Sequence, residues 1–215
     1  MATVKKFASN GWQIAAFYNQ KEGPKVDGVN WYKLEISDYD SVKNSFKIAL
    51  EYFGRIDCFV NCAGIYGYKG LKDYDEKLID KVIGVNEKGM YFTTKVILEN
   101  MTEGTIIYLS STTAQVGSSD PVYAGTKAAV LGFTKSMAKA LAPKIRVNAV
   151  SPGATNTDMM KHHNPDRLKQ LIEMSLLKRL GEPEDVANAI YFLGSNESIN
   201  ITGACIDVNG GYVLR

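Results

Sequence analysis

Three side chains that could exchange a proton lie in one short stretch of the sequence, from Leu109 to Val130. Tyr123 and Lys127 are four residues apart, so in a helix they share one face, and Ser111 stands in the polar loop before that helix. A phenol with a pKa of about 10 exchanges protons poorly near neutrality, and a nearby cation would lower that pKa. Ser111 could hydrogen bond a substrate oxygen as its charge changes. Taken alone, so short a pattern favours a surface pair on a helix beside a solvated serine loop, and the rest of the chain must decide.

The elements that must position these side chains alternate between strands and helices. An apolar strand over residues 105–109 leads into the serine loop, and a helix from Tyr123 to Ala142 carries the phenol and the ammonium. The other expected strands span residues 12–18, 31–36, 56–60, 145–150 and 204–208, and the other helices 2–10, 42–53, 75–85, 87–101 and 183–194. Nearly continuous apolar strands between helices predict an α/β fold, a doubly wound parallel sheet of Rossmann-like type, as a single domain over residues 1–215.

Small and polar residues follow three of these strands. They are Asn61-Cys62-Ala63-Gly64, Ser111, and the segment from Pro152 to Thr157. Open parallel sheets bind ligands beyond the carboxyl ends of their strands, and small residues there let a flat ligand approach the backbone closely. The coincidence of three such segments at one edge predicts a nucleotide site.

The composition limits the classes of protein and partner. A chain of 215 residues with 45% apolar residues can bury a core without disulfides. Cys58, Cys62 and Cys205 are an odd, scattered set, and no secretory signal is apparent, so we expect a cytoplasmic protein. A net charge of +2 with interspersed signs gives no surface for nucleic acid or membrane. The adjacent His162 and His163 have no third ligand at a suitable spacing, so no metal is expected.

Taken together, these motifs resemble the short-chain dehydrogenase/reductase family, in order and over nearly the whole chain. Asn61-Cys62-Ala63-Gly64 is similar to the family's N-N-A-G turn, and Ser111, Tyr123 and Lys127 match its serine and Y-x-x-x-K pair. Asn86, at the expected junction of two helices, falls where the family has a catalytic asparagine. Further matches are the segments Arg146 to Gly153 with Thr157, Arg179 to Asp185 (R-x-G-x-P-E-D), and Ile201 to Gly211 (I-T-G-x-x-x-x-V-N-G-G).

The resemblance implies an NAD(P)-dependent oxidoreductase that interconverts a hydroxyl and a carbonyl on a small molecule by hydride transfer. Tyr123 would be the general acid and base, and Ser111 would orient the substrate oxygen. Lys127 would lower the pKa of Tyr123 and hold the ribose, and Asn86 would anchor a water that relays the proton. Ser110 stays open as an alternative to Ser111, because the loop to Tyr123 is slightly shorter than in many relatives.

The resemblance also implies the cofactor contacts. They are Tyr18, Asn19, Asn61, Ala63, Gly64, Tyr123, Lys127, Pro152, Gly153, Thr155 and Thr157. An acidic residue after the strand 12–18 would select NAD through the ribose 2′-hydroxyl. Tyr18 and Asn19 stand there instead, and Lys21 and Lys25 lie close by in sequence. The expected preference is therefore NADP.

Two features of the family are absent from the sequence. It has no first strand with a T-G-x-x-x-G-x-G loop, whose amides hold the dinucleotide phosphates, and the helix between its first two strands is reduced to a loop. The absent strand would lie between strands 12–18 and 56–60, so either these two close on each other or the fold is marginally stable. A non-catalytic or cofactor-impaired relative, acting as a binding or assembly subunit, remains the alternative. The intact set of Ser111, Tyr123, Lys127 and Asn86 favours an enzyme, and a generic nucleotide-binding domain would leave that set unexplained.

The substrate is not identified by the sequence. Tyr66, Tyr68 and the loop from Met159 to Arg167 are expected to line a mixed apolar and polar pocket for an alcohol or carbonyl compound. The helices 87–101 and 123–142 carry apolar and small residues on more than one face, which indicates self-association into a dimer or tetramer.

Overall fold

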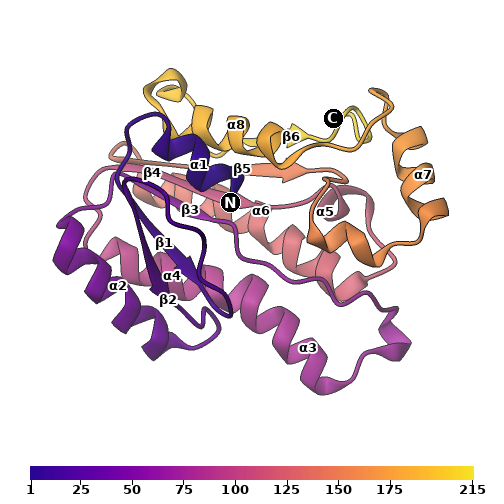
Figure 1. Cartoon of the computed structure of the whole chain (residues 1–215), viewed down its shortest axis with the longest axis horizontal. Coiled ribbons are helices and arrows are strands. Elements are labelled where there is room, and N and C mark those ends of the chain that lie inside the picture. The colour runs from indigo at the N-terminus through magenta and orange to yellow at the C-terminus, as the bar shows by residue number, and fades with distance from the viewer.

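The chain folds into six parallel strands with helices packed on both sides, in a computed structural model that describes residues 1–215 (Figure 1). The strands are β1 (Ile14–Tyr18), β2 (Val29–Lys33), β3 (Cys58–Asn61), β4 (Gly104–Leu109), β5 (Ile145–Pro152) and β6 (Cys205–Val208). The helices are α1 (Ala2–Ala8), α2 (Tyr39–Phe53), α3 (Glu76–Ile83), α4 (Gly89–Leu98), α5 (Thr113–Val116), α6 (Pro121–Leu141), α7 (Pro165–Met174) and α8 (Pro183–Gly194). A π-helical turn, Gly84–Lys88, joins α3 to α4, and 3-10 turns span Leu71–Asp73, Asp158–His162 and Asn196–Ser198.

Two hydrophobic clusters lie on opposite faces of the sheet β3–β4–β5–β6. Ile107 on β4 belongs to the cluster under α1 and α8, which contains Phe7 and Ile190. Its neighbour Ile106 belongs to the cluster under α2, α4 and α6, which contains Val42. Both isoleucines are fully buried, which explains why the strand has no polar alternation. The predicted doubly wound α/β arrangement is confirmed.

The six strands form two hydrogen-bonded sets instead of one continuous sheet. β1 pairs only with β2, and β3 begins the four-stranded set. A cavity of about 1890 Å³ is lined by every residue of β1 and β3. The two strands therefore do not close on each other, and each has one edge without a strand partner.

Several element boundaries differ from the sequence expectations, and three of the differences have a clear physical reason. β2 was expected over residues 31–36 but spans Val29–Lys33, because its partner β1 ends at Tyr18, opposite Lys33. α6 begins before Tyr123, at Pro121, because the Asp120 side chain caps it. The expected break at Asn86 is a π-helical turn, so α3 and α4 continue each other.

α1 is held to α8 and to the segment before β1 through contacts between aromatic rings. The ring of Phe7 lies 5.3 Å from that of Trp12 and 5.2 Å from that of Tyr191 on α8. Gly194 ends α8 where an added Cβ would come within 2.9 Å of the Phe7 ring, so glycine permits this close packing. None of the helices has the length and apolar character that crossing a bilayer requires.

Candidate active site

Helix α6 places Tyr123 and Lys127 on its inner face, toward β4. Only 7% of Tyr123 and 5% of Lys127 are exposed. Asp120 caps the helix by accepting a hydrogen bond from the Tyr123 backbone N–H at 3.0 Å, and Pro121 occupies its first turn, as is common at helix starts. The alternative of a solvated surface pair is therefore excluded.

The surroundings of Tyr123 raise the pKa of its phenol to about 12, chiefly because burial disfavours the phenolate. A hydrogen bond from the Ser111 hydroxyl acts in the opposite direction. Lys127 is not among the groups that shift this pKa, so the expectation that Lys127 lowers it is wrong for this structure. The phenol is therefore protonated at neutral pH and can donate a proton.

Lys127 directs its ammonium to the end of β4. Its Nζ donates to the backbone carbonyl of Leu109 at 2.9 Å and lies 5.7 Å from the centre of the Tyr123 ring. Burial lowers the pKa of Lys127 to about 8. An ammonium has three donors, so donors remain for a ligand hydroxyl beside Tyr123.

The two serines at the end of β4 have different partners. Ser110 is buried, and its Oγ donates to the Lys127 backbone carbonyl at 2.9 Å, so it ties the strand to α6. Ser111 is the serine whose hydroxyl faces Tyr123, and its Oγ also accepts from the Thr113 N–H at 3.2 Å. The geometry thus favours Ser111 over Ser110 as the group beside the phenol.

Asn86 lies in the π-helical turn, a local distortion that is frequent at functional sites. Its side chain accepts from the Ile65 N–H at 2.8 Å and donates to the Ile65 carbonyl at 2.9 Å and to Thr126 Oγ1 at 3.1 Å. The Asn86 side chain therefore fixes the segment after Gly64 against α6. All its described contacts are to protein groups, and the expected water relay remains a prediction.

The turn after β3 brings Asn61, Ala63 and Gly64 to the same edge. Asn61 Oδ1 accepts from the Ala63 N–H at 3.0 Å, and Asn61 Nδ2 donates to Thr93 Oγ1 at 3.4 Å. A Cβ on Gly64 would come within 3.2 Å of Lys127 Nζ and 3.6 Å of Asn86 Oδ1. Glycine thus keeps the backbone open in front of the buried ammonium, as a flat ligand would need.

The segment from Pro152 to Thr157 continues β5 at the same edge, because β5 is paired in parallel with β4. The Pro152 carbonyl accepts from the Thr112 N–H at 3.0 Å, which joins this segment to the serine loop. An added Cβ on Gly153 would lie 2.9 Å from Asn209 Cα, so only glycine fits. Thr155 and Thr157 bond to nearby backbone carbonyls of the same segment.

Tyr18 and Asn19 lie at the carboxyl end of β1 and line the same cavity as Asn61, Ala63 and Gly64. Asn19 Nδ2 donates to Glu35 Oε2 at 2.6 Å. Hydrogen bonds from Ser37 lower the pKa of Glu35, so an acidic group stands next to the expected cofactor contact. Sequence reasoning missed Glu35, although its position just after β2 was a usable signal.

An aromatic group borders Tyr123 on the outer side. The Tyr66 ring lies 4.6 Å from the Tyr123 ring and 4.7 Å from the Tyr68 ring. The Tyr68 ring lies 4.7 Å from that of His162, and its hydroxyl donates to the Met159 carbonyl at 2.8 Å. The structure thus brings together the tyrosines and the 159–167 loop that were expected to line the pocket.

These side chains bring a phenol, a hydroxyl and an ammonium together at one edge of the sheet, an arrangement that could exchange a proton with a bound molecule. Lys127 and the turn at Gly64 fit a nicotinamide and its ribose, because they offer donors and open backbone close to Tyr123. No glycine-rich loop is present to hold the phosphates. No three His, Cys, Asp or Glu side chains are grouped as a metal site would require.

Comparisons with known proteins give a consistent result. Residues 1–213 match the family model described as enoyl-(acyl carrier protein) reductase. The chain is 38% identical to 3-oxoacyl-(acyl-carrier-protein) reductase FabG of Thermotoga maritima, over 99% of this chain and 92% of that protein. It is 38% identical to L-rhamnose 1-dehydrogenase (NAD(P)(+)) of Azotobacter vinelandii, over 84% of this chain and 74% of that one.

Solved structures agree over the full length of the chain. A short-chain dehydrogenase/reductase described as a glucose/ribitol dehydrogenase, from Brucella melitensis, matches with a TM-score of 0.95 and 30% identity, covering 100% of this chain and 91% of that one. Aldohexose dehydrogenase of Thermoplasma acidophilum, in ligand-free form, matches with a TM-score of 0.93 and 28% identity, covering 100% and 89%.

Proposed function

Because the chain belongs to the short-chain dehydrogenase/reductase family and is an oxidoreductase of that family, we propose that it interconverts a hydroxyl and a carbonyl on a small molecule with NAD(P). The observation that carries this proposal is the buried phenol of Tyr123, protonated at neutral pH, beside the Ser111 hydroxyl. A binding protein has no need to bury these groups together.

In carbonyl reduction, Tyr123 donates its proton to the substrate oxygen while Ser111 donates a hydrogen bond to the same oxygen. Alcohol oxidation is the reverse step and requires the phenolate form of Tyr123, which accepts the proton of the substrate hydroxyl. Lys127 holds a ribose hydroxyl with its remaining donors. Asn86 fixes the Ile65 backbone at the edge of the site. A bound nicotinamide supplies or accepts the hydride.

The proposed cofactor is NADP. Its proposed contacts are the residues predicted from the sequence, namely Tyr18, Asn19, Asn61, Ala63, Gly64, Tyr123, Lys127, Pro152, Gly153, Thr155 and Thr157. Lys21 lines the cavity beside Asn19 and supplies positive charge for a 2′-phosphate. Glu35 opposes this charge, so the preference depends on the balance of the two charges.

We further propose that the protein forms dimers or tetramers. A cytoplasmic location is also proposed, and it suits the three free cysteines of the chain.

The substrate is proposed to be a small alcohol or carbonyl compound. The relatives named above act, by their names, on acyl-carrier-protein thioesters and on sugars. A panel of sugars, polyols, steroids and 3-oxoacyl thioesters, followed by nicotinamide absorbance with NADPH and NADH, tests the proposal. Turnover of one class by the parent chain supports it, and no turnover with either cofactor contradicts it.

A second candidate is a cofactor-impaired relative that serves as a binding or assembly subunit. The cavity between β1 and β3 and the lack of a phosphate-binding loop favour it. Turnover at saturating NADPH or NADH separates the two candidates, since a binding or assembly subunit should turn over no substrate of the panel even when the cofactor site is filled.

A further inference from the structure

Asp120 is a buried carboxylate that the proposed chemistry does not use. Only 1% of the residue is exposed. Its Oδ1 accepts from the Tyr123 N–H at 3.0 Å and from the Tyr74 hydroxyl at 2.7 Å, and its Oδ2 accepts from the N–H groups of Gly67 at 2.9 Å and Tyr68 at 3.0 Å. No cation is among these partners. A buried carboxylate is stable only when such donors satisfy it.

Capping α6 explains one of these four bonds. A helix cap needs a single acceptor, which serine or threonine provides as well as aspartate. The other three donors come from residues 67–74, more than 45 positions earlier in the chain. Asp120 therefore joins the start of the catalytic helix to a distant loop.

The loop that Asp120 holds carries the aromatic residues beside Tyr123. Tyr66 contacts the Tyr123 ring, and its hydroxyl lies 2.9 Å from Ser118 Oγ, two residues before Asp120. Tyr68 has a backbone φ of 59°, which is uncommon for a residue with a side chain and persists only where the surroundings hold it. The two amides that Asp120 Oδ2 accepts from are those of Gly67 and Tyr68.

Gly67 shows how closely the loop fits this carboxylate. An added Cβ would lie 1.8 Å from the Tyr74 hydroxyl and 3.0 Å from Asp120 Oδ2. Any larger residue must displace Tyr74 or the carboxylate. The loop and Asp120 therefore form one fitted unit.

We propose that Asp120 is a positioning residue that fixes Tyr66 and Tyr68 against Tyr123 and so sets how firmly the substrate is held. This inference rests on the proposed function, because it assigns Tyr66 and Tyr68 to the substrate side of the same site. Tyr123 stays in place as long as the α6 cap is kept. Loss of the other three bonds therefore weakens substrate binding more than proton transfer.

The test is the variant Asp120→Ser, which keeps a cap for α6 but cannot reach the loop amides. We expect KM to rise by about tenfold or more with kcat within about threefold of the parent, the pattern of lost binding that the ground and transition states share. The pH profile of kcat, which reports Tyr123, should not move. The matched control is Asp75→Ser, because Asp75 caps α3 through a bond to the Leu78 N–H and is exposed.

Gly67→Ala disturbs the contact between Asp120 and the loop from the loop side. It is the substitute test if Asp120→Ser fails to fold. It should raise KM similarly, and the double variant should be no worse than either single one, because both break the same contacts. An unchanged KM in folded Asp120→Ser or Gly67→Ala would overturn the proposal, as would an equal rise in Asp75→Ser.

Hydrogen exchange separates this inference from the proposed function. The amides of Gly67 and Tyr68 should be protected in the parent and exchange at least tenfold faster in Asp120→Ser, whether or not any substrate turns over. Unprotected amides in the parent would refute the contact itself, while protected amides in a chain without turnover would refute only the proposed function.

Discussion

At the scale of single residues, burial decides which proton the site can move. The phenol of Tyr123, with a pKa near 12, is neutral through the physiological range, and Lys127, with a pKa near 8, is close to losing its charge. Sequence spacing correctly placed both groups on one helix face. It could not foresee their pKa values, because desolvation depends on the strands and loops packed around them.

Tyr123→Phe should abolish turnover and leave the fold intact, because it removes the titrating hydroxyl and keeps the buried ring. General acid and base groups typically contribute about 10²- to 10⁴-fold in rate. The measurement is kcat on the best substrate of the panel, with circular dichroism as the control for folding. A rate within threefold of the parent would show that another group transfers the proton.

Lys127→Met should be more stable than the parent at pH 7, and this advantage should shrink as the pH rises to 10. Burial lowers the pKa of Lys127 from 10.5 to about 8, so between these values the unfolded chain binds a proton that the folded chain does not. Stability then increases with pH, by up to about 3 kcal/mol for this shift. Cys58, whose pKa is raised to about 12 by desolvation, and Tyr123 act in the opposite direction, but they are common to both proteins.

Denaturant unfolding of the two proteins at pH 7 and pH 10 gives this difference directly. An advantage that stays constant over that range would mean that Lys127 keeps its charge when folded.

Cofactor choice should follow the charges around Asn19. We expect kcat/KM to favour NADP over NAD, and Glu35→Gln to strengthen that preference, because it removes a negative charge bonded to Asn19. Lys21→Glu should shift the preference toward NAD. The measurement is kcat/KM with each cofactor at fixed substrate, and a clear preference of the parent for NAD contradicts the prediction.

At the scale of elements, the sequence predicted the type and order of the strands and helices well, but it did not predict local distortions within a helix. Apolar runs located all six strands, and the stripe from Val42 to Phe53 located α2. The π-helical turn at Asn86 has no sequence period of its own, so it read as a break. Asp120 and Pro121 were a usable start signal for α6. The three bonds from Asp120 to residues 67–74 were not predictable, because they join segments far apart in the chain.

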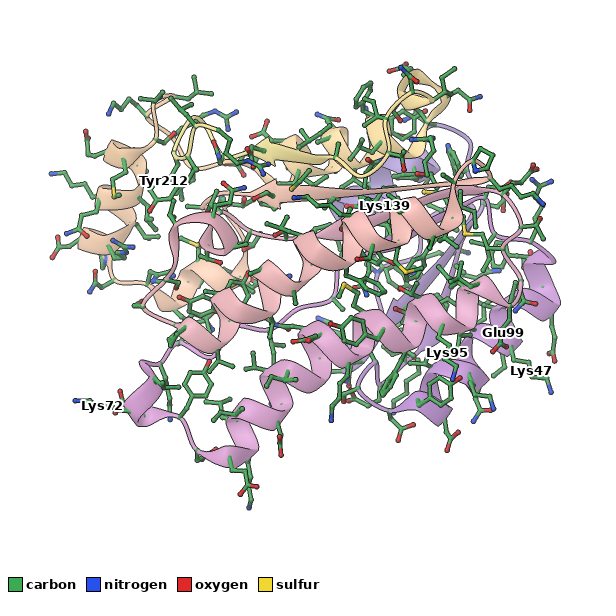
Figure 2. The ribbon with its side chains drawn as sticks, turned by 180° about the vertical axis from the view of Figure 1, so that it is seen from behind. Lys47, Lys72, Lys95, Glu99, Lys139 and Tyr212 are labelled. Atoms are coloured by element: carbon green, nitrogen blue, oxygen red, sulfur yellow. The ribbon has the colours of Figure 1, made fainter.

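The outer face of α6 bears on the predicted oligomer. α6 lies beside α4 across the back of the molecule, with the rings of Tyr91 and Phe133 4.9 Å apart (Figure 2). Gly125, Ala128 and Gly132 are exposed on α6, and an added Cβ on either glycine would meet nothing within 4 Å. Small residues on an exposed helix face allow a second helix to approach closely.

Gly132→Trp should therefore convert a dimer or tetramer to a smaller species without unfolding it. The side chain has room in a single chain but would obstruct a partner packed on α6. Sedimentation velocity at micromolar concentration measures the change, and Lys47→Trp on the exposed face of α2 is the control. A parent that sediments as a monomer, or a Gly132→Trp variant that sediments like the parent, would contradict this assignment.

At the scale of the whole molecule, the division into two strand sets is the dominant feature. β1 and β3 both line the cavity of about 1890 Å³ and each lacks a strand partner on that side. Strand periodicity could predict that each strand is buried on both faces, but not whether neighbouring strands would meet. The chain nevertheless matches a solved short-chain dehydrogenase/reductase over its whole length.

A strand added in front of Met1 should therefore fill this cavity. We expect an N-terminal extension of five aliphatic residues and a T-G-x-x-x-G-x-G loop to pair with both β1 and β3. About five buried aliphatic side chains at ~1.5 to 3 kcal/mol each amount to roughly 10 kcal/mol, comparable with the ~5 to 15 kcal/mol that stabilises a whole domain. Denaturant unfolding should show the gain, and an extension with serine in place of the aliphatic residues is its control.

The same extension should raise cofactor affinity, and for a different reason. The backbone amides of a glycine-rich loop at a helix start bind phosphates, and the 215-residue chain has no such loop. We expect it to bind NAD(P)H at least ~100-fold more weakly than the extended chain, which corresponds to about 2.7 kcal/mol. An extension that keeps the aliphatic strand but replaces the loop glycines with valine should recover stability without affinity, because the strand fills the cavity while the loop no longer admits phosphates. Titration of all three proteins with NADPH and NADH decides the matter: low-micromolar dissociation constants for the 215-residue chain would mean that its own residues hold the phosphates, and that the cavity between β1 and β3 does not limit cofactor binding.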